Sequence, residues 1–353
     1  MKLGIISQIS ESSKMIQKEC LDYFDKVDMI NIKDVSVEAA TKVLETVSER
    51  KKIDIYDCLY LRGSYKNALL LRAISESCRN KIYTPIRPEA FTVGHDKFLT
   101  ILELQKQGID IPKTYVASTI SSAKKILEGV NYPVIVKIPS GTHGKGVMVA
   151  DTFAAASSVL DTLEVFKQPY IIQDYVETNA TDLRAIVIGD KVIAAMRRKA
   201  SNGELRANIH MGGTGTPIEL DYATERVAVK AANAVGADIC AVDILESRKP
   251  KVIEVNLSPG LRGITSVTKK NVAGKIGKFL YDRTQQFIES KKKQDFKDII
   301  GVINKDEREI VTNLDIKLGK IRLPDIVSKL SEIKDEEEVV IKVNKGKIEI
   351  EKH

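Results

Sequence analysis

The sequence predicts an α/β (α+β) protein of two or three domains. Of its 353 residues, 43% are hydrophobic and 29% are charged, a balance typical of globular rather than disordered chains. Over residues 1–90, apolar strands alternate with helical stretches, as in a small unit with a parallel sheet. After residue 130, pairs of strands follow one another across short turns, as in antiparallel hairpins. The chain therefore combines both kinds of sheet.

The first domain is expected at residues 1–90. Its strands are "KLGIIS", "VDMINI" and "DCLYL", and its helices are "SVEAATKVLETVSER" and "YKNALLLRAISESC". The third strand ends at Arg62 and Gly63, and Ser64 can cap the helix that follows. An arginine beside a helix N-terminus favours an anion. Arg62 and Ser64 therefore either form an anion site or belong to an ordinary strand–helix junction.

The second segment, residues 91–170, contains a glycine-rich loop. A helix begins at Asp96-Lys97, and "NYPVIVKIPSGTHGKGVMVAD" predicts two strands joined by a loop with Gly141, Gly144 and Gly146. A P-loop is excluded, because Gly146 rather than Ser or Thr follows the lysine and a strand comes next. The loop either covers phosphates with its free N–H groups or is a plain hairpin.

The rest of the chain is expected to form two further domains, residues 171–292 and residues 297–353. "IIQDYVE" predicts a strand, and Gly189-Asp190 in the next tract fits a two-residue hairpin turn. The helices "ATERVAVKAANAVG" and "VAGKIGKFLYDRTQQFIES" follow. The charged run "KKKQD" from Lys291 is expected to be a linker. Beyond it we expect strands, one helix begun by Pro324 and a final hairpin.

Two carboxylates are predicted to face each other in "DICAVDILESRKPKVIEVNLS". If Glu246 pairs with Lys251, Asp243 lies opposite Glu254, and Asn256 shares the sheet face of Glu254. Facing carboxylates repel each other unless a positive charge lies between them. They either bind Mg²⁺ with a nucleotide completing its ligands, or lie on a solvated face. Apolar neighbours and the Pro-Gly pair that ends the strand favour the metal site.

Lys137 is the second charge in an unexpected place. It lies in the apolar strand "VIVKI", where a half-buried ammonium needs a partner. A nucleotide phosphate or an internal carboxylate would serve. In "QDYVE", polar and apolar residues alternate at a strand end, as expected of a contact with an adenine edge and a ribose.

Composition excludes several other classes of site. The four cysteines are far apart and the four histidines scattered, which indicates reduced thiols and no zinc centre. No apolar run approaches the roughly 20 residues of a membrane span, and "MKLGIISQIS" predicts a first strand rather than a signal peptide, so we expect a cytoplasmic protein. The net charge is −2 over residues 298–353 and +9 over the first 297, which suits anionic partners or reflects a lysine-rich background. A low aromatic content disfavours nucleic acid.

The order of these features resembles a known family. Asp96-Lys97, Lys137, the glycine hairpin, "IIQDYVE", "TDLR", "RANIHMGG", "VDI" and "EVNLSPG" are similar to the RimK-type ligases of the ATP-grasp superfamily, which add glutamate to carboxylate-ended acceptors. The resemblance covers about residues 1–290. It implies an ATP-grasp fold with an N-terminal pre-ATP-grasp α/β domain (1–90), a small subdomain (91–170), a large subdomain with the metal and catalytic site (171–292) and a small C-terminal α+β appendage (297–353).

The resemblance also implies roles for residues. ATP contacts would come from two lysines, an adenine hinge and three further residues: Lys97, Lys137, Gln173, Asp174, Tyr175, Val176, Asp182, Arg206 and Asn208. Asp243, Glu254 and Asn256 would bind two Mg²⁺ ions, which Mn²⁺ would be able to replace. Arg184, Arg198 and Arg206 would grip an acyl phosphate and substrate carboxylates, although Arg184 and Arg206 are alternatively internal salt-bridge partners.

Departures from the family pattern leave the acceptor open. Met211 replaces a basic residue, Arg262 replaces an acid and Lys145 is added near the expected acceptor entrance. Arg262 therefore joins Arg62 and Ser64 as a candidate for binding an acidic small molecule or a peptide end. The incoming amino acid is L-glutamate or another amino acid, and a carrier-protein acceptor or a non-catalytic nucleotide-binding regulator are the alternatives. We expect a homo-oligomer that binds neither membrane nor nucleic acid.

Overall fold

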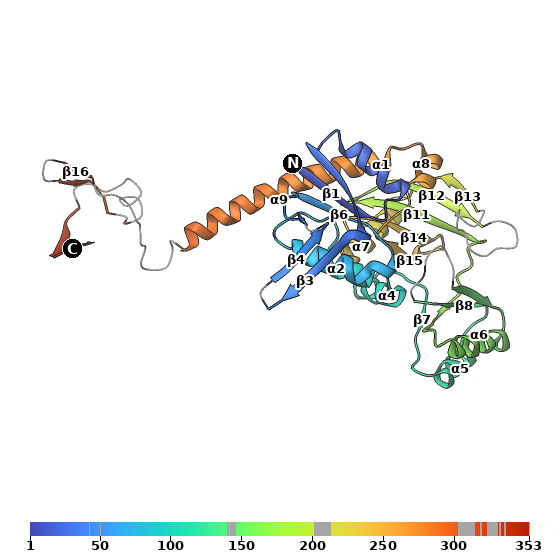
Figure 1. Cartoon of the computed structure of the whole chain (residues 1–353). Coiled ribbons are helices and arrows are strands. Elements are labelled where there is room, and N and C mark those ends of the chain that lie inside the picture. The colour runs from blue at the N-terminus through green and yellow to red at the C-terminus, as the bar shows by residue number, and fades with distance from the viewer. Residues whose placement is uncertain are drawn as a thin grey trace. The chain divides into compact units, whose positions relative to one another are not determined.

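The computed structural model describes residues 1–41, 43–49, 51–139, 141, 146–200, 213–302, 315–317, 320–322, 331, 333–334 and 337–352. The chain divides into two compact units, Met1–Glu289 and Ser290–His353 (Figure 1). Among the described helices, none is both long enough and apolar enough to span a membrane.

The first unit begins with a parallel sheet. Strands β1 (Lys2–Ser7), β2 (Lys26–Asn31) and β6 (Cys58–Leu61) lie in the order β2-β1-β6 and run parallel, as predicted. Every residue of β6 is buried, which explains its continuous apolar sequence. Helices α1 (Glu11–Cys20) and α2 (Ala68–Cys78) connect to these strands, with the short 3₁₀ helices Ile32–Asp34 and Tyr65–Asn67.

The helix expected in "SVEAATKVLETVSER" is wrong, because this segment is a hairpin. β3 (Val35–Ala40) pairs antiparallel with β4 (Val43–Ser48), and β4 pairs with β5 (Lys51–Lys52). Glu and Ala gave the segment a helical composition, but its valines and threonines are β-branched and fit a pleated strand. On this hairpin Val35 and Thr46 are buried, whereas Glu38 is exposed to solvent.

A smaller body of the first unit has its own core. Its sheet has the order β7-β10-β8-β9, formed by β7 (Thr114–Tyr115), β10 (Ile171–Asp174), β8 (Val134–Lys137) and β9 (Val147–Ala150). Helices α5 (Ile120–Glu128) and α6 (Phe153–Val165) carry the rest of this core. The predicted hairpin around the glycine loop is confirmed as β8–β9. β10 belongs to this sheet, so it lies across the boundary expected at residue 170, because its hydrogen bonds go to β7 and β8.

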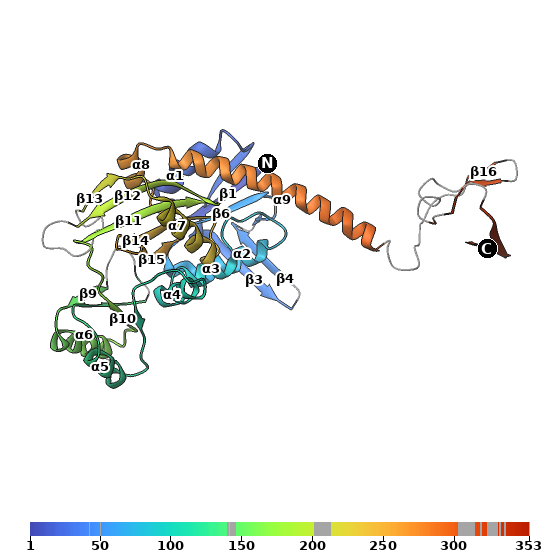
Figure 2. The ribbon, with the colours of Figure 1, turned by 180° about the vertical axis from the view of Figure 1, so that it is seen from behind.

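A five-stranded antiparallel sheet forms the centre of the unit. Its order is β13-β12-β11-β14-β15, with β11 (Thr181–Ile188), β12 (Lys191–Lys199), β13 (Thr214–Pro217), β14 (Ile239–Leu245) and β15 (Lys251–Asn256). The predicted turn at Gly189-Asp190 is confirmed, and Gly189 has φ +61°. Helix α7 (Tyr222–Val235) packs on this sheet, and one core joins it to the N-terminal sheet (Figure 2).

Three short helices border the central sheet. α3 (Pro88–Val93) leads into α4 (Lys97–Lys106), whose N-cap Asp96 accepts hydrogen bonds from the Phe98 and Leu99 amides. α4 contacts α7 and β15, and α8 (Arg262–Thr268) contacts β12 and β13. The lysine at the start of α4 is thereby held beside the strand that carries Glu254.

The linker expected at Lys291 is wrong, because helix α9 runs from Val272 to Val302. Lysine and glutamine are good helix formers, and neither glycine nor proline occurs between Gly277 and Gly301. In the second unit, β16 (Asp315–Lys317) pairs with β17 (Lys320–Arg322), and β18 (Val339–Asn344) pairs with β19 (Lys347–Lys352). The final hairpin is thus confirmed, and the helix expected at Pro324 lies outside the described residues.

Candidate active site

The predicted carboxylate pair is present on β14 and β15. Asp243 pairs with Glu254, as expected, but near the turn Leu245 rather than Glu246 pairs with Lys251. A β-bulge between Asp243 and Ile244 reconciles the two registers, because the extra residue on β15 shifts the pairing by one. The hairpin therefore brings both carboxylates together by a kinked ladder rather than a regular one.

Burial and like charge act together on these carboxylates. Asp243 is only 4% exposed, and the Asn256 amide donates to its Oδ2 at 3.1 Å. Burial raises the pKa of Glu254, and the charge of Asp243 raises it further. Lys97, Arg184 and Lys137 act in the opposite direction on the pKa of Glu254. The carboxylates thus lie among cationic groups, as the facing-carboxylate argument requires.

Two arginines on the central sheet, Arg184 and Arg198, bind the carboxylate of Asp243 directly. Arg184 Nη1 lies 3.0 Å from both oxygens of Asp243, and Arg198 Nη2 lies 3.2 Å from Oδ2 of the same residue. Arg198 also binds Asp182 through two hydrogen bonds of 2.6 and 2.8 Å and is 7% exposed. Burial raises the pKa of Asp182 to about 6, against the opposing charge of Arg198. The sequence left open whether Arg184 grips substrate or forms an internal salt bridge, and in the structure it forms a salt bridge with Asp243. Arg198 also forms internal salt bridges, with Asp182 and Asp243.

Two lysines approach the same region from other elements. Lys137, on β8, donates from Nζ to the Gln173 side chain, and the Gln173 amide donates to Thr114 Oγ1 at 2.9 Å. Its partner is therefore a neutral amide rather than a carboxylate. Burial lowers the pKa of Lys137 to about 8, an effect that Glu254 opposes and Lys97 adds to. Lys97 Nζ lies 3.3 Å from the carbonyl oxygen of Gly141, in the glycine loop.

The expected adenine hinge contains a buried acceptor with nothing to accept. Asp174 Oδ1 is buried and has no hydrogen-bond partner among the residues that the structure describes. Buried polar atoms are normally satisfied, so such an atom indicates a missing donor. Tyr175 and Val176 follow it and are partly exposed. Sequence reasoning did not single out Thr114, which orients Gln173, or His95. The Nε2 atom of His95 is buried with no partner in the described part of the chain, and burial lowers the pKa of His95 to about 4.

Among the described residues, no contact joins the acceptor candidates to one another. Arg62 is 3% exposed and donates to three protein oxygens, so the expectation that it binds an acceptor is wrong: its guanidinium is enclosed by its own fold. Ser64 holds the N-cap position of the Tyr65–Asn67 turn without a side-chain hydrogen bond, and Arg262 is exposed at the start of α8. Gly144, Lys145, Arg206, Asn208 and Met211 lie outside the described residues.

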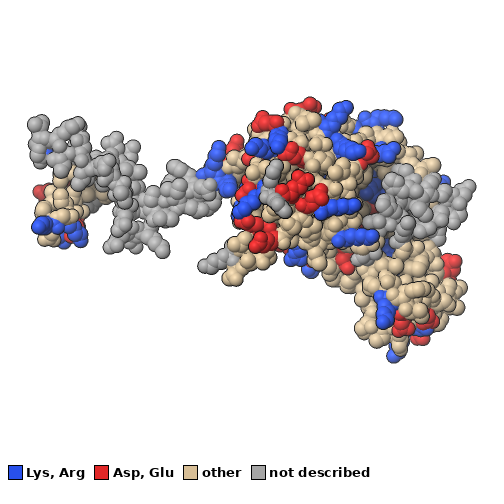
Figure 3. Space-filling model, viewed as in Figure 1, with Lys and Arg blue, Asp and Glu red and all other residues tan. Residues whose placement is uncertain are grey.

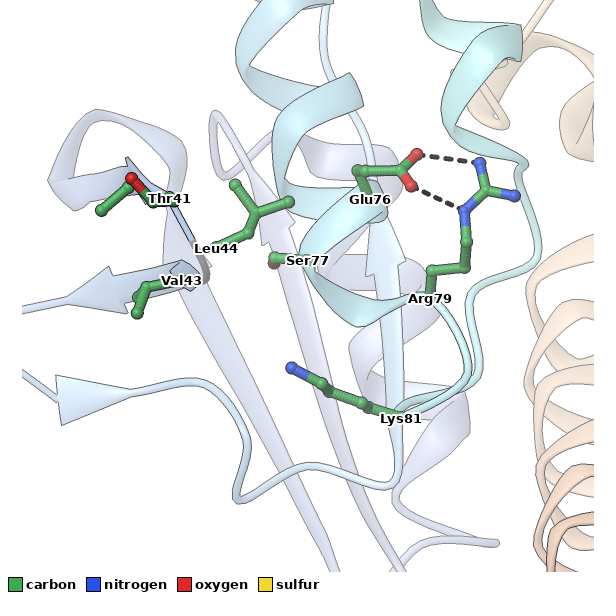
Figure 4. A pocket seen from close by; sticks show the side chains of 8 residues that line it. Thr41, Val43, Leu44, Glu76, Ser77, Arg79 and Lys81 are labelled. Carbon is green, nitrogen blue, oxygen red and sulfur yellow. Dashed lines mark hydrogen bonds and ion pairs between the residues drawn. The ribbon is translucent and has the colours of Figure 1, made fainter.

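Other surface features do not coincide with these residues. A cavity of about 360 Å³ lies between the β3–β4 hairpin and the end of α2, lined among others by Thr41, Ser77 and Lys81 (Figure 4). None of the predicted site residues lines it. On the face of the first unit seen in Figure 3, basic and acidic side chains alternate. This mixed face gives no support to the nucleic-acid alternative, which needs a basic stripe.

Comparison with known proteins assigns the family. A model described as the RimK-like ATP-grasp domain matches residues 94–280. The chain belongs to the RimK-like ATP-grasp family. It is 32% identical over 291 residues to a probable alpha-L-glutamate ligase of Cellvibrio japonicus, covering 81% of this chain and 97% of that one. It is also 41% identical over 194 residues to a probable alpha-L-glutamate ligase of Thioalkalivibrio sulfidiphilus, covering 54% and 64%.

Solved structures share the ATP-grasp fold. A RimK domain protein of Sphaerobacter thermophilus aligns with a TM-score of 0.62 at 14% identity, covering 79% of this chain and 99% of that one. The ATP-grasp ligase PsnB, crystallised with a minimal precursor, Mg and ADP, aligns with a TM-score of 0.62 at 16% identity, covering 80% and 98%. The chain is therefore an ATP-grasp ligase, a family that uses ATP and Mg²⁺. The carboxylates, the half-buried Lys137 and the Asp174 oxygen, which has no partner among the described residues, fit that chemistry.

Proposed function

We propose that this RimK-like ATP-grasp ligase joins the carboxylate of an acidic acceptor to the amine of an amino acid. The amino acid is L-glutamate, by analogy with the relatives named probable alpha-L-glutamate ligases. The γ-phosphate of ATP passes to the acceptor carboxylate, the amine attacks the resulting acyl phosphate, and an amide, ADP and phosphate are released. The observation that carries this proposal is the pairing of Asp243 with Glu254 beside two lysines.

The metal site proposed here consists of Asp243, Glu254 and Asn256. Carboxylate and amide oxygens are the ligands that Mg²⁺ prefers, and a bound nucleotide would supply further oxygens. We propose two ions, with Mn²⁺ able to replace them. When bound, the metal neutralises phosphate charge. Asp243 is held for this task by Arg184, Arg198 and the Asn256 amide, which fix its carboxylate before any ligand binds.

The nucleotide site proposed here lies on the side of the small sheet. Lys137 and Lys97 are assigned to the phosphates, because the ammonium of Lys137 is half-buried and among the described residues donates to a neutral amide, so that it favours an anion. The segment from Gln173 to Val176 is assigned to the adenine, with Asp174 Oδ1 free to accept from an amino group. Asp182 completes the pocket. The family resemblance adds Arg206, Asn208 and the glycine loop (Gly141, Gly144, Gly146).

Charge neutralisation is the main task of these residues, because the transferred phosphoryl group is an anion that meets another anion. Arg184 has one half of its fork on Asp243 and is proposed to grip the transferring group together with Arg206. Arg198 is buried between Asp182 and Asp243, so we now assign it to holding those carboxylates rather than to gripping substrate.

The acceptor remains an inference from charge. Arg262 is exposed at the start of α8 and, with Ser64, is retained as a candidate for an acidic small molecule or peptide end. A different amino acid or a carrier-protein acceptor would use the same chemistry. The limits of the domains, a homo-oligomeric state and a cytoplasmic location also stay predictions.

Product analysis tests this function. The full chain is incubated with Mg-ATP, L-glutamate and the acidic small molecules of a cell extract, and the products are read by mass spectrometry. ADP together with an acceptor heavier by one glutamate residue would support the proposal and identify the acceptor. AMP and pyrophosphate would contradict it, because they require an adenylate instead of an acyl phosphate.

A further inference from the structure

The loop 257–261, which joins the metal strand β15 to α8, is held by the N-terminal domain. Arg62 Nη2 donates to the carbonyl oxygen of Pro259 at 2.8 Å, and the Gly63 amide donates to Ser258 Oγ at 3.0 Å. The Leu261 amide donates to Ser12 Oγ at 2.9 Å. All three bonds lie within the first unit. We call Ser12, Arg62 and Gly63 the N-terminal clasp.

The charged guanidinium of Arg62 is buried and donates its hydrogen bonds to neutral oxygens. Its other hydrogen bonds go to Ser13 Oγ at 3.2 Å and to the Tyr60 hydroxyl at 3.0 Å, and its guanidinium lies 5.4 Å from the centroid of the Tyr60 ring. Among the described residues, no carboxylate forms an ion pair with it. Burying an arginine is costly, so this arrangement calls for a reason beyond stability. Its hydrogen bond to the Pro259 carbonyl has an ionised donor, and such bonds are stronger than those between neutral groups.

The backbone around Gly63 is shaped for the same contact. A side chain at this position would begin 2.8 Å from Leu71 Cδ1, so glycine is what lets the strand end pass close to α2. In the loop itself, Leu257, Pro259 and Leu261 are buried while Gly260 is exposed. The loop is therefore fixed at three successive points within five residues of Asn256.

We propose that the clasp positions the metal strand: by fixing loop 257–261, Arg62 sets the placement of Asn256 and Glu254 for Mg²⁺. This inference rests on the proposed metal site. Arg62 itself contacts neither metal nor nucleotide, so it is a positioning residue and not a catalytic one. The N-terminal domain thereby governs how tightly the active site binds its metal-nucleotide complex.

Calorimetric titration of the full chain with ADP, once with Mg²⁺ and once with EDTA, tests the clasp without needing an acceptor. The quantity of interest is the factor by which Mg²⁺ strengthens ADP binding. Arg62→Met is expected to reduce this factor about tenfold, the lower end of the effect of losing a group that supports metal ligands. ADP affinity in EDTA should stay at the wild-type value, which a general loss of structure would not spare.

Arg72→Met is the matched control. Arg72 is an arginine of the same domain that also donates to a neutral oxygen, Thr92 Oγ1 at 3.0 Å, but it is exposed and forms none of the three hydrogen bonds of the clasp. This variant should behave as wild type. Arg62→Lys should recover part of the Mg²⁺ effect, because a compact ammonium keeps the charge but lacks the planar fork that reaches the three separate acceptors of Arg62.

The double variant Ser12→Ala with Ser258→Ala keeps the charge and removes the other two bonds of the clasp. It should reduce the Mg²⁺ effect in the same direction, and it decides the question if Arg62→Met does not fold. A folded Arg62→Met, or a folded double variant, with the wild-type Mg²⁺ effect would overturn the clasp. If the wild-type chain binds ADP with the same affinity in Mg²⁺ and in EDTA, the proposed metal site on which the clasp rests would be overturned instead.

Discussion

The two sheets that supply the candidate site solve opposite electrostatic problems. The five-stranded sheet carries two buried carboxylates whose partners are already in place: Asp182 binds Arg198, and Asp243 binds Arg184, Arg198 and the Asn256 amide. The four-stranded sheet brings the half-buried ammonium of Lys137, which among the described residues donates to the neutral side-chain amide of Gln173. One sheet therefore presents charge that is balanced within the protein. The other presents charge that still favours an anion, which suits the phosphates of a nucleotide placed between them.

The largest effect is expected on the carboxylate side. Glu254→Gln keeps the shape of the side chain and removes its charge, so turnover should fall on the order of 100-fold or more for lack of a metal ligand. Because burial and Asp243 raise the pKa of Glu254, its ionised form opposes folding at neutral pH. The free energy of unfolding should therefore be unchanged or higher in the variant, as urea titration will show.

Glu246→Gln is the control for that variant, since Glu246 lies just beyond β14 and forms an exposed ion pair with Arg197. It should retain wild-type turnover. Equal activity of Glu254→Gln and wild type would refute the metal role of this strand.

The next largest effect concerns the balance of charge within the sheet. Arg198→Met leaves the carboxylates of Asp182 and Asp243 without a shared partner in a buried place, and should cost about 3–5 kcal/mol of unfolding free energy. Its neighbour Arg197 forms an exposed pair with Glu246, so Arg197→Met should cost no more than about 1 kcal/mol. Urea unfolding of the two variants side by side measures the difference. Equal costs would mean that the buried network is no more important than a surface pair.

A smaller and pH-dependent effect is expected on the lysine side. The pKa of Lys137 is lowered to about 8, so its ammonium is present at pH 7 and is lost as the pH rises through 8. ADP affinity measured in EDTA should therefore fall between pH 7 and pH 9. The same lowered pKa means that protonated Lys137 opposes folding below pH 8, an opposition relieved as the pH rises toward its unfolded value.

Lys137→Met should bind ADP weakly at both pH values and lose the pH dependence. Lys124→Met, which removes an ion pair with Asp161 on the surface of the same body, should keep it. An unchanged pH profile in Lys137→Met would show that another group titrates.

The smallest effect is expected from truncation. Residues up to Glu289 form a compact unit that contains the whole candidate site. Ending the chain after Lys293 should therefore leave Mg²⁺-dependent ADP binding within about twofold of wild type, a change near the limit of measurement. An insoluble product would place the C-terminal residues in the core of the first unit.

The carboxylate pair was predictable because strand pairing and a two-residue period are local rules, and they placed Asp243 opposite Glu254 despite the bulge. Prediction of secondary structure from local composition was wrong where tertiary packing determines whether a segment is helix or strand. "SVEAATKVLETVSER" has helix formers but forms a hairpin strand pair that buries Thr46. Arg62 was misassigned for a different reason: its acceptor on Pro259 lies 197 residues away in the sequence, where no local pattern reveals it.

The most direct test of the central claim is a crystal structure of the full chain with Mn²⁺ and ADP, using the anomalous scattering of the metal to locate it. The account predicts Mn²⁺ bound by Asp243, Glu254 and Asn256, with the ADP phosphates toward Lys97 and Lys137. Mn²⁺ and ADP bound together away from these residues would contradict it.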